Sequence, residues 1–290
     1  MSILPFDDRD GWIWFNGKIV PWRDAKIHVL SHGLHYGSCV FEGERAYNGK
    51  IFKIREHSER LHQSAKLLGF EIPYSVEELD KAKIEIAAKQ NIKNGYLRPV
   101  AWRGSEMMAI SAQATTIHVA IAAWEWPSYF GNEAKEKGLK LQTSKWARPA
   151  PNTAPTASKA AGLYMICTMS KHAAEKYGFN DSLMLDYRGY VAEATGANLF
   201  FVFNGELHTP TPDCFLNGLT RQTVMQLARD AGITVVERHI KPEEIKNCTE
   251  MFLTGSAAEV TPIGQVDDFT LPVGPMTKKL MQLYTDLVNS

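Results

Sequence analysis

The sequence predicts a two-domain protein of α+β or α/β class, and three observations carry this prediction. The chain has 290 residues, which exceeds the usual size of a single hydrophobic core. Roughly the first 125 residues read as strands with helices grouped between them, as in a small α+β domain. After a segment rich in Pro, Gly and charge, WPSYFGNEAKEKG, a second series of strands and helices follows. We therefore expect a small domain over 1–127, a linker over 128–135 and a larger domain over 136–290.

Two hairpins and two helices are expected in the small domain. Apolar runs flank Asn16-Gly17 and Asn48-Gly49, and Asn-Gly tolerates the positive φ angles of a type I′ turn. The second helix begins with the capping pattern SVEE. The expected helices are Glu56–Gly69 and Ser75–Gln90, and the later strands are Tyr96–Trp102 and Ile117–Trp124.

The larger domain is expected to alternate strands with helices. Gly178 and Gly232 end two of these helices, as glycine commonly does at helix C-termini. The expected helices are Gly162–Tyr177, Gly218–Ala231, Pro242–Asn247 and Gly274–Asn289. The expected strands are 139–149, Ser182–Leu185, Val191–Ala192, Leu199–Phe203, Glu206–Thr209, Ile233–Arg238 and Glu250–Leu253.

Composition excludes several classes of protein. Basic and acidic residues number 32 each, so no overall field attracts nucleic acid. No apolar run approaches the length of a membrane helix, and the N-terminus lacks the regions of a signal peptide. Four scattered cysteines argue against a disulfide framework. His32 and His35 lack companion ligands at metal-site spacing, so no metal is expected. We expect a cytoplasmic protein without nucleic-acid or membrane partners.

Lys159 and Glu193 are the residues whose surroundings point to chemistry. Lys159 is flanked only by Ala, Ser and Gly, which leave space for a bulky group. Burial would lower the pKa of its amine and make it a nucleophile toward carbonyls, whereas the alternative is an ordinary solvated lysine. Glu193 precedes an apolar strand, where a buried carboxylate needs a positive partner such as a protonated pyridine nitrogen. The alternative for Glu193 is an exposed hairpin glutamate.

Two segments could bind a phosphate. Gly218-Leu219-Thr220 opens a helix, and backbone N–H groups at a helix N-terminus bind anions. Thr254-Gly255-Ser256-Ala257 follows a strand, and Arg60 could complete such a site. Each segment is a weak signal by itself, because both are also ordinary cap and turn sequences.

Seven separated segments, in order over nearly the whole chain, form one pattern. They are HYGSCVFEGERAY, REHSERLHQSAK, YLRPVAW, RPAPNTAPTASKAAGLY, AEATGANLFFV, NGLTRQTV and LTGSAAEVTPI. Together they resemble the fold-type IV pyridoxal-phosphate (PLP) enzymes, and within that group they are most similar to branched-chain amino-acid aminotransferases. The resemblance implies a D-amino-acid aminotransferase-like fold, in which the larger, PLP-binding domain has a curved, barrel-like sheet with flanking helices.

The resemblance implies a role for each cofactor-binding residue. Lys159 would hold PLP as an internal Schiff base and would move the proton between the substrate and the cofactor. Glu193 would pair with the pyridine nitrogen, and Tyr164 would hydrogen-bond the ring oxygen O3′. The positions that match the phosphate site are Arg60, Gly218, Leu219, Thr220 and Ser256.

The reaction implied is ping-pong transamination of Leu, Ile and Val with 2-oxoglutarate, which gives branched-chain 2-oxo acids and L-glutamate. Tyr36, Phe41 and Gly43 match the branched-chain pattern, in which an apolar, aromatic-walled pocket takes the substrate side chain. Arg45 also stands in the expected place. The partners implied are therefore small amino acids and 2-oxo acids.

Carboxylate recognition is implied at two further places. Tyr96 and Arg98 match the pair in which arginine receives the distal carboxylate of glutamate or 2-oxoglutarate. The amides of Ser256 and Ala257 would hold the α-carboxylate. The family also implies a homodimer or a dimer-based hexamer, in which the loop of Tyr36 reaches the neighbouring active site.

Two positions depart from the branched-chain pattern. Met107 to Ile110 stand where a Gly-Val pair is expected, and Ala197 stands where some members carry glutamate. The first departure bears on the shape of the pocket loop and therefore on the choice among apolar amino acids. The alternatives are an aminodeoxychorismate lyase, a D-amino-acid or R-selective amine transaminase, and a cofactor-binding protein without catalysis.

Overall fold

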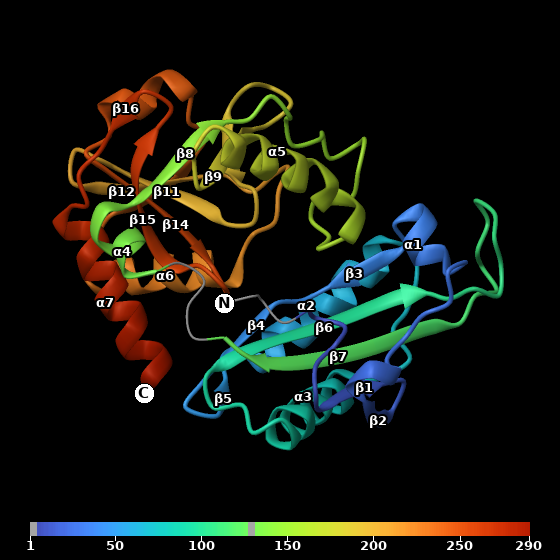
Figure 1. Ribbon diagram of the computed structural model, residues 1–290. Coiled ribbons are helices and arrows are strands. Elements are labelled where there is room, and N and C mark those ends of the chain that lie inside the picture. Colours follow the sequence, from blue (N-terminus) through green and yellow to red (C-terminus); the bar gives the residue numbers. More distant parts are fainter. Residues whose placement is uncertain (1–4, 127–130) are drawn as a thin grey trace. The chain divides into compact units, whose positions relative to one another are not determined.

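The computed structural model describes residues 5–126 and 131–290 (Figure 1). Its chain divides into two compact units, each formed from two stretches of sequence. Unit 1 comprises Met1–Pro127 and Ser158–Gly162, and unit 2 comprises Ser128–Ala157 and Leu163–Ser290. The short stretch with Lys159 thus belongs to unit 1, although its sequence lies within the range predicted for the larger domain.

The predicted linker is described only in part. Residues 128–130 lie outside the described residues. Beyond them, a short helix, α4 (Asn132–Lys137), begins inside the predicted range of 128–135. The described part of the predicted linker therefore already contains regular structure.

Unit 1 contains an antiparallel sheet of seven strands, in the order β2-β1-β7-β6-β4-β5, with β3 also paired to β6. Both predicted Asn-Gly turns are present: Asn16 and Asn48 have φ angles of 49° and 50°, each followed by a glycine of positive φ. The strands are β1 (Trp12–Phe15), β2 (Lys18–Pro21), β3 (Cys39–Phe41), β4 (Glu44–Tyr47), β5 (Lys50–Ile51), β6 (Gly95–Arg103) and β7 (Ile117–Glu125).

Two long helices, α2 (Ile54–Leu67) and α3 (Val76–Lys89), pack against this sheet (Figure 1). The predicted capping box of α3 is confirmed, because the Ser75 side chain accepts from the backbone N–H of Glu78 and the Glu78 side chain accepts from that of Ser75. Two shorter helices are α1 (His32–Tyr36) and a 3-10 turn, η1 (Trp22–Asp24).

The central strands β6 and β7 divide their side chains between the two faces of the sheet. Successive side chains of a strand point to opposite faces. The odd-numbered residues join the hydrophobic core beneath α2 and α3, namely Leu97, Ala101, Val119, Ile121 and Ala123. Even-numbered residues such as Tyr96 and Arg98 therefore lie on the other face.

Unit 2 is built on a closed barrel. Six strands pair in a ring, β10-β9-β8-β15-β14-β11, because β11 pairs back to β10. The strands β12 and β13 extend the sheet from β11, and β16 pairs with β15. The bounds are β8 (Leu139–Thr143), β9 (Asp181–Leu185), β10 (Val191–Ala194), β11 (Asn198–Phe203), β12 (Glu206–Pro210), β13 (Val235–Arg238), β14 (Glu250–Gly255), β15 (Glu259–Val266) and β16 (Phe269–Thr270). The barrel-like sheet implied by the family resemblance is confirmed.

The strand β15 is a central element of the barrel that the sequence did not predict. It pairs antiparallel with β14 and parallel with β8, so the ring cannot close without it. Its sequence, EVTPIGQV, contains Pro262 and Gly264, and both residues are depleted in strand interiors. Because of these two residues, strand propensity alone does not predict this central strand.

The helices of unit 2 lie outside the barrel sheet, with α6 and α7 beside β14 and β15 and with α5 beside β9 (Figure 1). Besides α4, they are α5 (Met165–Lys176), preceded by the 3-10 turn η2 (Ala161–Tyr164), α6 (Leu219–Asp230), the 3-10 helix η3 (Pro242–Asn247) and α7 (Pro275–Asn289). Each predicted helix of this domain is present within a few residues. In the described part of the chain, no helix has both the length and the apolar character needed to span a bilayer.

Candidate active site

In unit 1, Lys159 is held against the strand that carries Phe41. The backbone N–H of Phe41 donates to the carbonyl of Lys159 at 3.2 Å, and the N–H of Lys159 donates to the hydroxyl of Ser64 at 3.0 Å. The ammonium nitrogen lies 4.8 Å from the centre of the Phe41 ring. Strand β3 and helix α2 thus fix the backbone of Lys159, and an aromatic ring faces its amine.

The environment of Lys159 lowers the pKa of its amine to about 8. Burial is the main cause, because it penalises the charged form, and the positive charges of Arg60 and Arg98 add to it. The carboxylate of Glu42 acts in the opposite direction. The fraction of this amine that is unprotonated near neutral pH is therefore larger than for an ordinary lysine, and the unprotonated form is the nucleophile toward a carbonyl.

Four of the predicted substrate-binding residues share one face of the unit 1 sheet. Register pairs Arg45 with Tyr96 and Phe41 with Val100, and Arg98 is two residues beyond Tyr96 on the same strand. The guanidinium of Arg98 donates to the Tyr96 hydroxyl at 3.3 Å and lies 4.8 Å from the Phe41 ring centre. We call Lys159, Phe41, Tyr96 and Arg98 the Lys159 group.

Gly43 is required by the position of Tyr96. A Cβ atom at residue 43 would collide with the Tyr96 hydroxyl. The glycine therefore allows the aromatic side chain to reach the end of β3. Gly43 belongs beside the Lys159 group for a steric reason.

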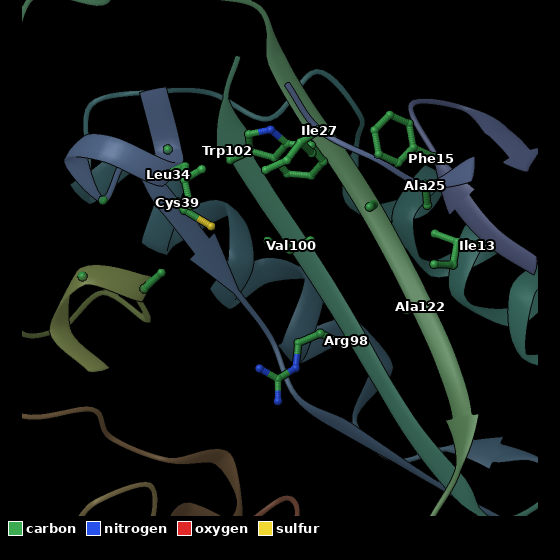
Figure 2. Close-up of a pocket in the computed structure, with 15 residues that line it drawn as sticks. Ile13, Phe15, Ala25, Ile27, Leu34, Cys39, Arg98, Val100, Trp102 and Ala122 are labelled. Carbon is green, nitrogen blue, oxygen red and sulfur yellow. The ribbon is translucent and has the colours of Figure 1, made fainter. Parts of the chain in front are cut away.

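A cavity of about 580 Å³ covers the same face of the sheet (Figure 2). Its walls are mostly apolar or small residues, including Val100, Trp102 and Gly162. Figure 2 shows Arg98 at one end of the cavity, and Trp102 and Ile27 toward the other. Of the predicted substrate-binding residues, Arg98 lines this cavity, whereas Tyr36, Phe41, Gly43, Arg45 and Tyr96 are not among its lining residues.

Tyr36 and the segment of residues 107–110 lie near His32. The Tyr36 ring stacks on His32 with centroids 4.6 Å apart, and it is 44 % exposed. Nε2 of His32 donates to the carbonyl of Ala109 at 2.9 Å. His32 thus connects helix α1 to residues 107–110, the segment that departs from the branched-chain pattern. This segment is largely exposed.

In unit 2, Glu193 is buried and paired. The carboxylate of Glu193 lies 3.2 Å from Nε of Arg148, and both side chains are at most 10 % exposed. Burial alone would lower the pKa of Arg148, but the charges of Glu193, Cys167 and Tyr164 outweigh it and raise this pKa. The exposed-hairpin alternative for Glu193 is therefore wrong. Tyr164, the last residue of η2, belongs to the electrostatic environment of Arg148.

Asn198 connects Glu193 to the start of helix α6. Its side-chain amide donates to the Glu193 carboxylate at 3.3 Å, and its side-chain oxygen accepts from the backbone N–H of Gly218 at 3.1 Å. A Cβ atom at residue 218 would collide with that oxygen. We call Glu193, Arg148 and Asn198 the Glu193 group.

The two predicted phosphate-binding segments both adjoin the Glu193 group through the barrel. Asn198 pairs with Glu193 on one neighbouring strand and with Thr254 on the other, so the three residues lie side by side across β10, β11 and β14. Ser256 and Ala257 form the turn that follows β14. Helix α6 begins at Leu219 and Thr220, and no side chain among the described residues caps its N-terminus.

Arg60, the remaining predicted phosphate ligand, lies in unit 1 and makes a bidentate ion pair with Glu42. Nε and Nη2 of Arg60 each donate to one Glu42 oxygen at 2.7 Å. Glu42 is fully buried, and Nδ1 of His57 also lies 2.7 Å from it.

Three residues that contact predicted site residues were not indicated by the sequence: Glu42, Arg148 and Asn198. One feature of the sequence could have indicated Glu42. In the strand-like run FEGER, two glutamates stand at alternate positions, and therefore on one face of the strand. Arg148 closes a strand-like run, and Asn198 stands among small residues. Their roles depend on partners in other elements.

Comparison with known proteins defines the class. Residues 39–266 match the family described as Amino-transferase class IV. Since this match covers well over half of the chain, the protein belongs to the class IV aminotransferases. The transaminase class expected from the sequence is confirmed.

Relatives within this class carry a narrower name. A protein of Pseudomonas aeruginosa named branched-chain-amino-acid aminotransferase is 42 % identical over 97 % of this chain and 94 % of its own. One of Escherichia coli K12 with the same name is 40 % identical over 95 % and 92 %.

Solved structures of branched-chain amino acid aminotransferases have the same fold as this chain. The branched-chain amino acid aminotransferase of Escherichia coli matches with a TM-score of 0.93 at 39 % identity, covering 97 % of this chain and 95 % of its own. The protein of the same name from T.th., solved with pyridoxamine 5′-phosphate, matches with a TM-score of 0.94, the same identity and the same coverage. The expected fold-type IV architecture is confirmed.

Proposed function

We propose that this class IV aminotransferase uses PLP to transfer the amino group of Leu, Ile or Val to 2-oxoglutarate. The observation that carries the proposal is the Lys159 amine, whose pKa is lowered to about 8 and which faces the Phe41 ring beside Arg98. The names of the relatives support the substrate class. The T.th. protein was solved both with N-(5′-phosphopyridoxyl)-L-glutamate, which has a distal carboxylate, and with 4-methylvaleric acid, which has a branched aliphatic chain.

The residues present fit PLP. Within the described residues no side chain caps the N-terminus of α6, and such a terminus suits a phosphate. Glu193 is a buried carboxylate, which suits a protonated pyridine nitrogen. Lys159 offers an amine of lowered pKa. When bound, PLP supplies an electron-accepting ring that stabilises negative charge at the substrate Cα.

Lys159 would hold the cofactor through its amine and would then act as the acid and base of the reaction. The lowered pKa would let the released amine take a proton from the substrate Cα and return it at C4′ of the cofactor. Phe41 packs against the amine and keeps water from that side.

Glu193 would keep the ring nitrogen protonated. Arg148 and Asn198 hold the carboxylate in place. Tyr164 would donate to the ring oxygen.

Arg98 would distinguish the two substrate types. Its Nε atom is buried without a hydrogen-bond partner within the described residues, so it can donate to the distal carboxylate of glutamate. The ring of Phe41 and the apolar neighbourhood suit an aliphatic side chain. Arg45 and Tyr96 would orient this end of the substrate, while Ser256 and Ala257 would hold the α-carboxylate.

A spectroscopic half-reaction tests the proposed function. Protein loaded with PLP should show a visible band that shifts on addition of L-leucine and returns on addition of 2-oxoglutarate, as ping-pong kinetics require. A band that responds to D-alanine but not to L-leucine would contradict the substrate assignment. Failure to bind PLP would contradict the whole proposal.

We also propose that the chain forms a homodimer or a dimer-based hexamer. Exposed apolar side chains gather in the loop before and within α1, at Ile27, Val29, Leu30, Leu34 and Tyr36. Some of them line the apolar cavity of unit 1, and such patches are typical of interfaces. Light scattering should give at least twice the chain mass of 32.5 kDa, and a monomer at micromolar concentration would contradict this proposal.

A cytoplasmic location is proposed as well. The four cysteines, Cys39, Cys167, Cys214 and Cys248, are free thiols, as is usual in a reducing compartment. Cell fractionation should recover the activity with cytoplasmic markers, and recovery with an exported fraction would contradict the assignment.

A further inference from the structure

We propose that Glu42 is a positioning residue of the PLP site: its buried carboxylate holds the Arg60 guanidinium in the orientation that binds the cofactor phosphate. This inference rests on the proposed function. It adds a residue that has no contact with the substrate, because Glu42 acts through Arg60.

The contacts of Glu42 fix Arg60 at two points. Nε and Nη2 of Arg60 donate to separate oxygens of the carboxylate at 2.7 Å each. Such a fork defines the plane and the direction of a guanidinium, which a single hydrogen bond does not. His57 contacts the carboxylate as well, at 2.7 Å, so Glu42 is itself held in place.

Strand alternation explains why Glu42 lies behind the sheet. Phe41 and Arg45 lie on the face of the Lys159 group, opposite Val100 and Tyr96. Glu42 and Glu44 alternate with them and point the other way, toward helices α2 and α3. Glu42 therefore contacts α2, while Phe41 and Arg45 lie on the opposite face of the sheet, with the Lys159 group.

Helix α2 places Arg60 and Ser64 one turn apart, on the same side. Ser64 accepts the backbone N–H of Lys159 through its hydroxyl, and its carbonyl accepts from the Ser158 hydroxyl at 3.0 Å. The same face of α2 thus holds Arg60 and the segment of Lys159. A shift of this face of α2 would therefore displace both Arg60 and the segment that contains Lys159.

The charge of Glu42 also reaches Lys159. Burial would raise the pKa of Glu42, but Arg60 and His57 outweigh it and hold this pKa well below its usual range, so the group is anionic. Its negative charge raises the pKa of Lys159, whereas Arg60 lowers it. Without Glu42, the pKa of Lys159 should fall below about 8.

Glu44 provides a matched control. It is as fully buried as Glu42 and lies two residues further along the same side of the strand. Its partner is Lys83, at 2.7 Å, and burial raises the pKa of Glu44. A defect that follows from disturbing any buried ion pair should therefore appear in both Glu42→Gln and Glu44→Gln.

The experiment measures two quantities in purified, full-length protein. One is the PLP dissociation constant. The other is the pH midpoint at which Lys159 of the cofactor-free protein reacts with a small acylating reagent, followed by mass spectrometry. Glu42→Gln should weaken PLP binding by about tenfold and lower the midpoint, because it loses charged hydrogen bonds to Arg60 and a charge near Lys159. Glu44→Gln should lower the thermal stability and leave both quantities unchanged.

A double variant tests whether Glu42 acts through Arg60. In the Arg60→Ala background, Glu42→Gln should cause no further loss of PLP affinity. Additive losses would overturn the proposal.

Glu42→Asp keeps the test decisive if Glu42→Gln does not fold. The shorter aspartate keeps the charge but cannot span the fork, so PLP should bind about tenfold more weakly while the midpoint stays near the wild-type value. PLP binding as tight as in the wild type, in either variant, would overturn the role of Glu42 alone. A wild-type protein that binds no PLP would instead overturn the proposed function.

Discussion

The Lys159 group and the Glu193 group are built in different ways. Lys159 is held by segments far apart in sequence, and buried ion pairs such as Glu42 with Arg60 balance the charges around it. Glu193 lies in a barrel ladder, side by side with Asn198 and Thr254, and its carboxylate pairs with Arg148. In the first group a change of charge should therefore alter both geometry and pKa. In the second, the strand register fixes position and the side chains chiefly set charge.

Lys159→Ala should have the largest effect. Because the reacting amine is removed, the half-reaction with L-leucine should slow by at least about 10⁴-fold in stopped-flow measurements. Lys18→Ala changes an exposed lysine of β2 in the same unit and should react at the wild-type rate. If Lys159→Ala kept its rate within tenfold, the chemistry could not reside in the Lys159 group.

Arg148→Ala tests the Glu193 group through its stability. The change leaves the buried Glu193 carboxylate without its ion partner, so the free energy of unfolding should fall by about 3 to 5 kcal/mol in urea titrations. Arg148→Ala combined with Glu193→Gln removes the charge as well and should be more stable than the single variant. A double variant no more stable than Arg148→Ala would show that the ion pair is not the cause.

The pKa of Lys159 predicts how the stability of the cofactor-free protein depends on pH. Between pH 8 and 10.5 the folded state binds fewer protons than the unfolded state, because the pKa is lowered only on folding. The free energy of unfolding should therefore rise across this window, by at most about 3 kcal/mol. Well below pH 8, Lys159 is protonated in both states, so its effect on the pH dependence of stability should vanish. Urea titrations of the wild type and of Lys159→Met measure it, since the methionine variant should lack this rise. Parallel curves for the two proteins would contradict the lowered pKa.

Arg98→Ala should have the smallest effect, and it separates the two substrates. Loss of a charged hydrogen bond should weaken the binding of L-glutamate by about tenfold, corresponding to about 1.4 kcal/mol. L-leucine has no distal carboxylate, so its affinity should change much less. Equal losses for both amino acids would remove the proposed role of Arg98 in recognising the carboxylate.

Local signals in the sequence predicted much of the fold. The Asn-Gly turns and the SVEE cap were found because turn and cap geometry depends on neighbouring residues. The strand β15 was missed because Pro262 and Gly264 oppose strand propensity, and only its pairing partners on both sides make it a strand.

The candidate site was predictable to a smaller extent. The sequence indicated Lys159 and Glu193 from their immediate surroundings, and the resemblance supplied the roles. Their partners were not visible: Ser64 is 95 residues from Lys159, and Arg148 is 45 residues from Glu193 in the chain. Buried polar groups find partners through the tertiary fold, and no spacing rule along the sequence indicates them.

Lys159 belongs to unit 1 because the chain returns to this unit over the short segment Ser158–Gly162. A fragment ending at Pro127 would keep Arg98 and Phe41 but lack Lys159, and a fragment beginning at Ser128 would have Lys159 without the aromatic ring that faces its amine. The chain passes between the units at three places, so no continuous stretch of sequence contains all of unit 1 without part of unit 2. A gene segment that carries Lys159 together with Phe41 and Arg98 must therefore also carry the stretch Ser128–Ala157 of unit 2.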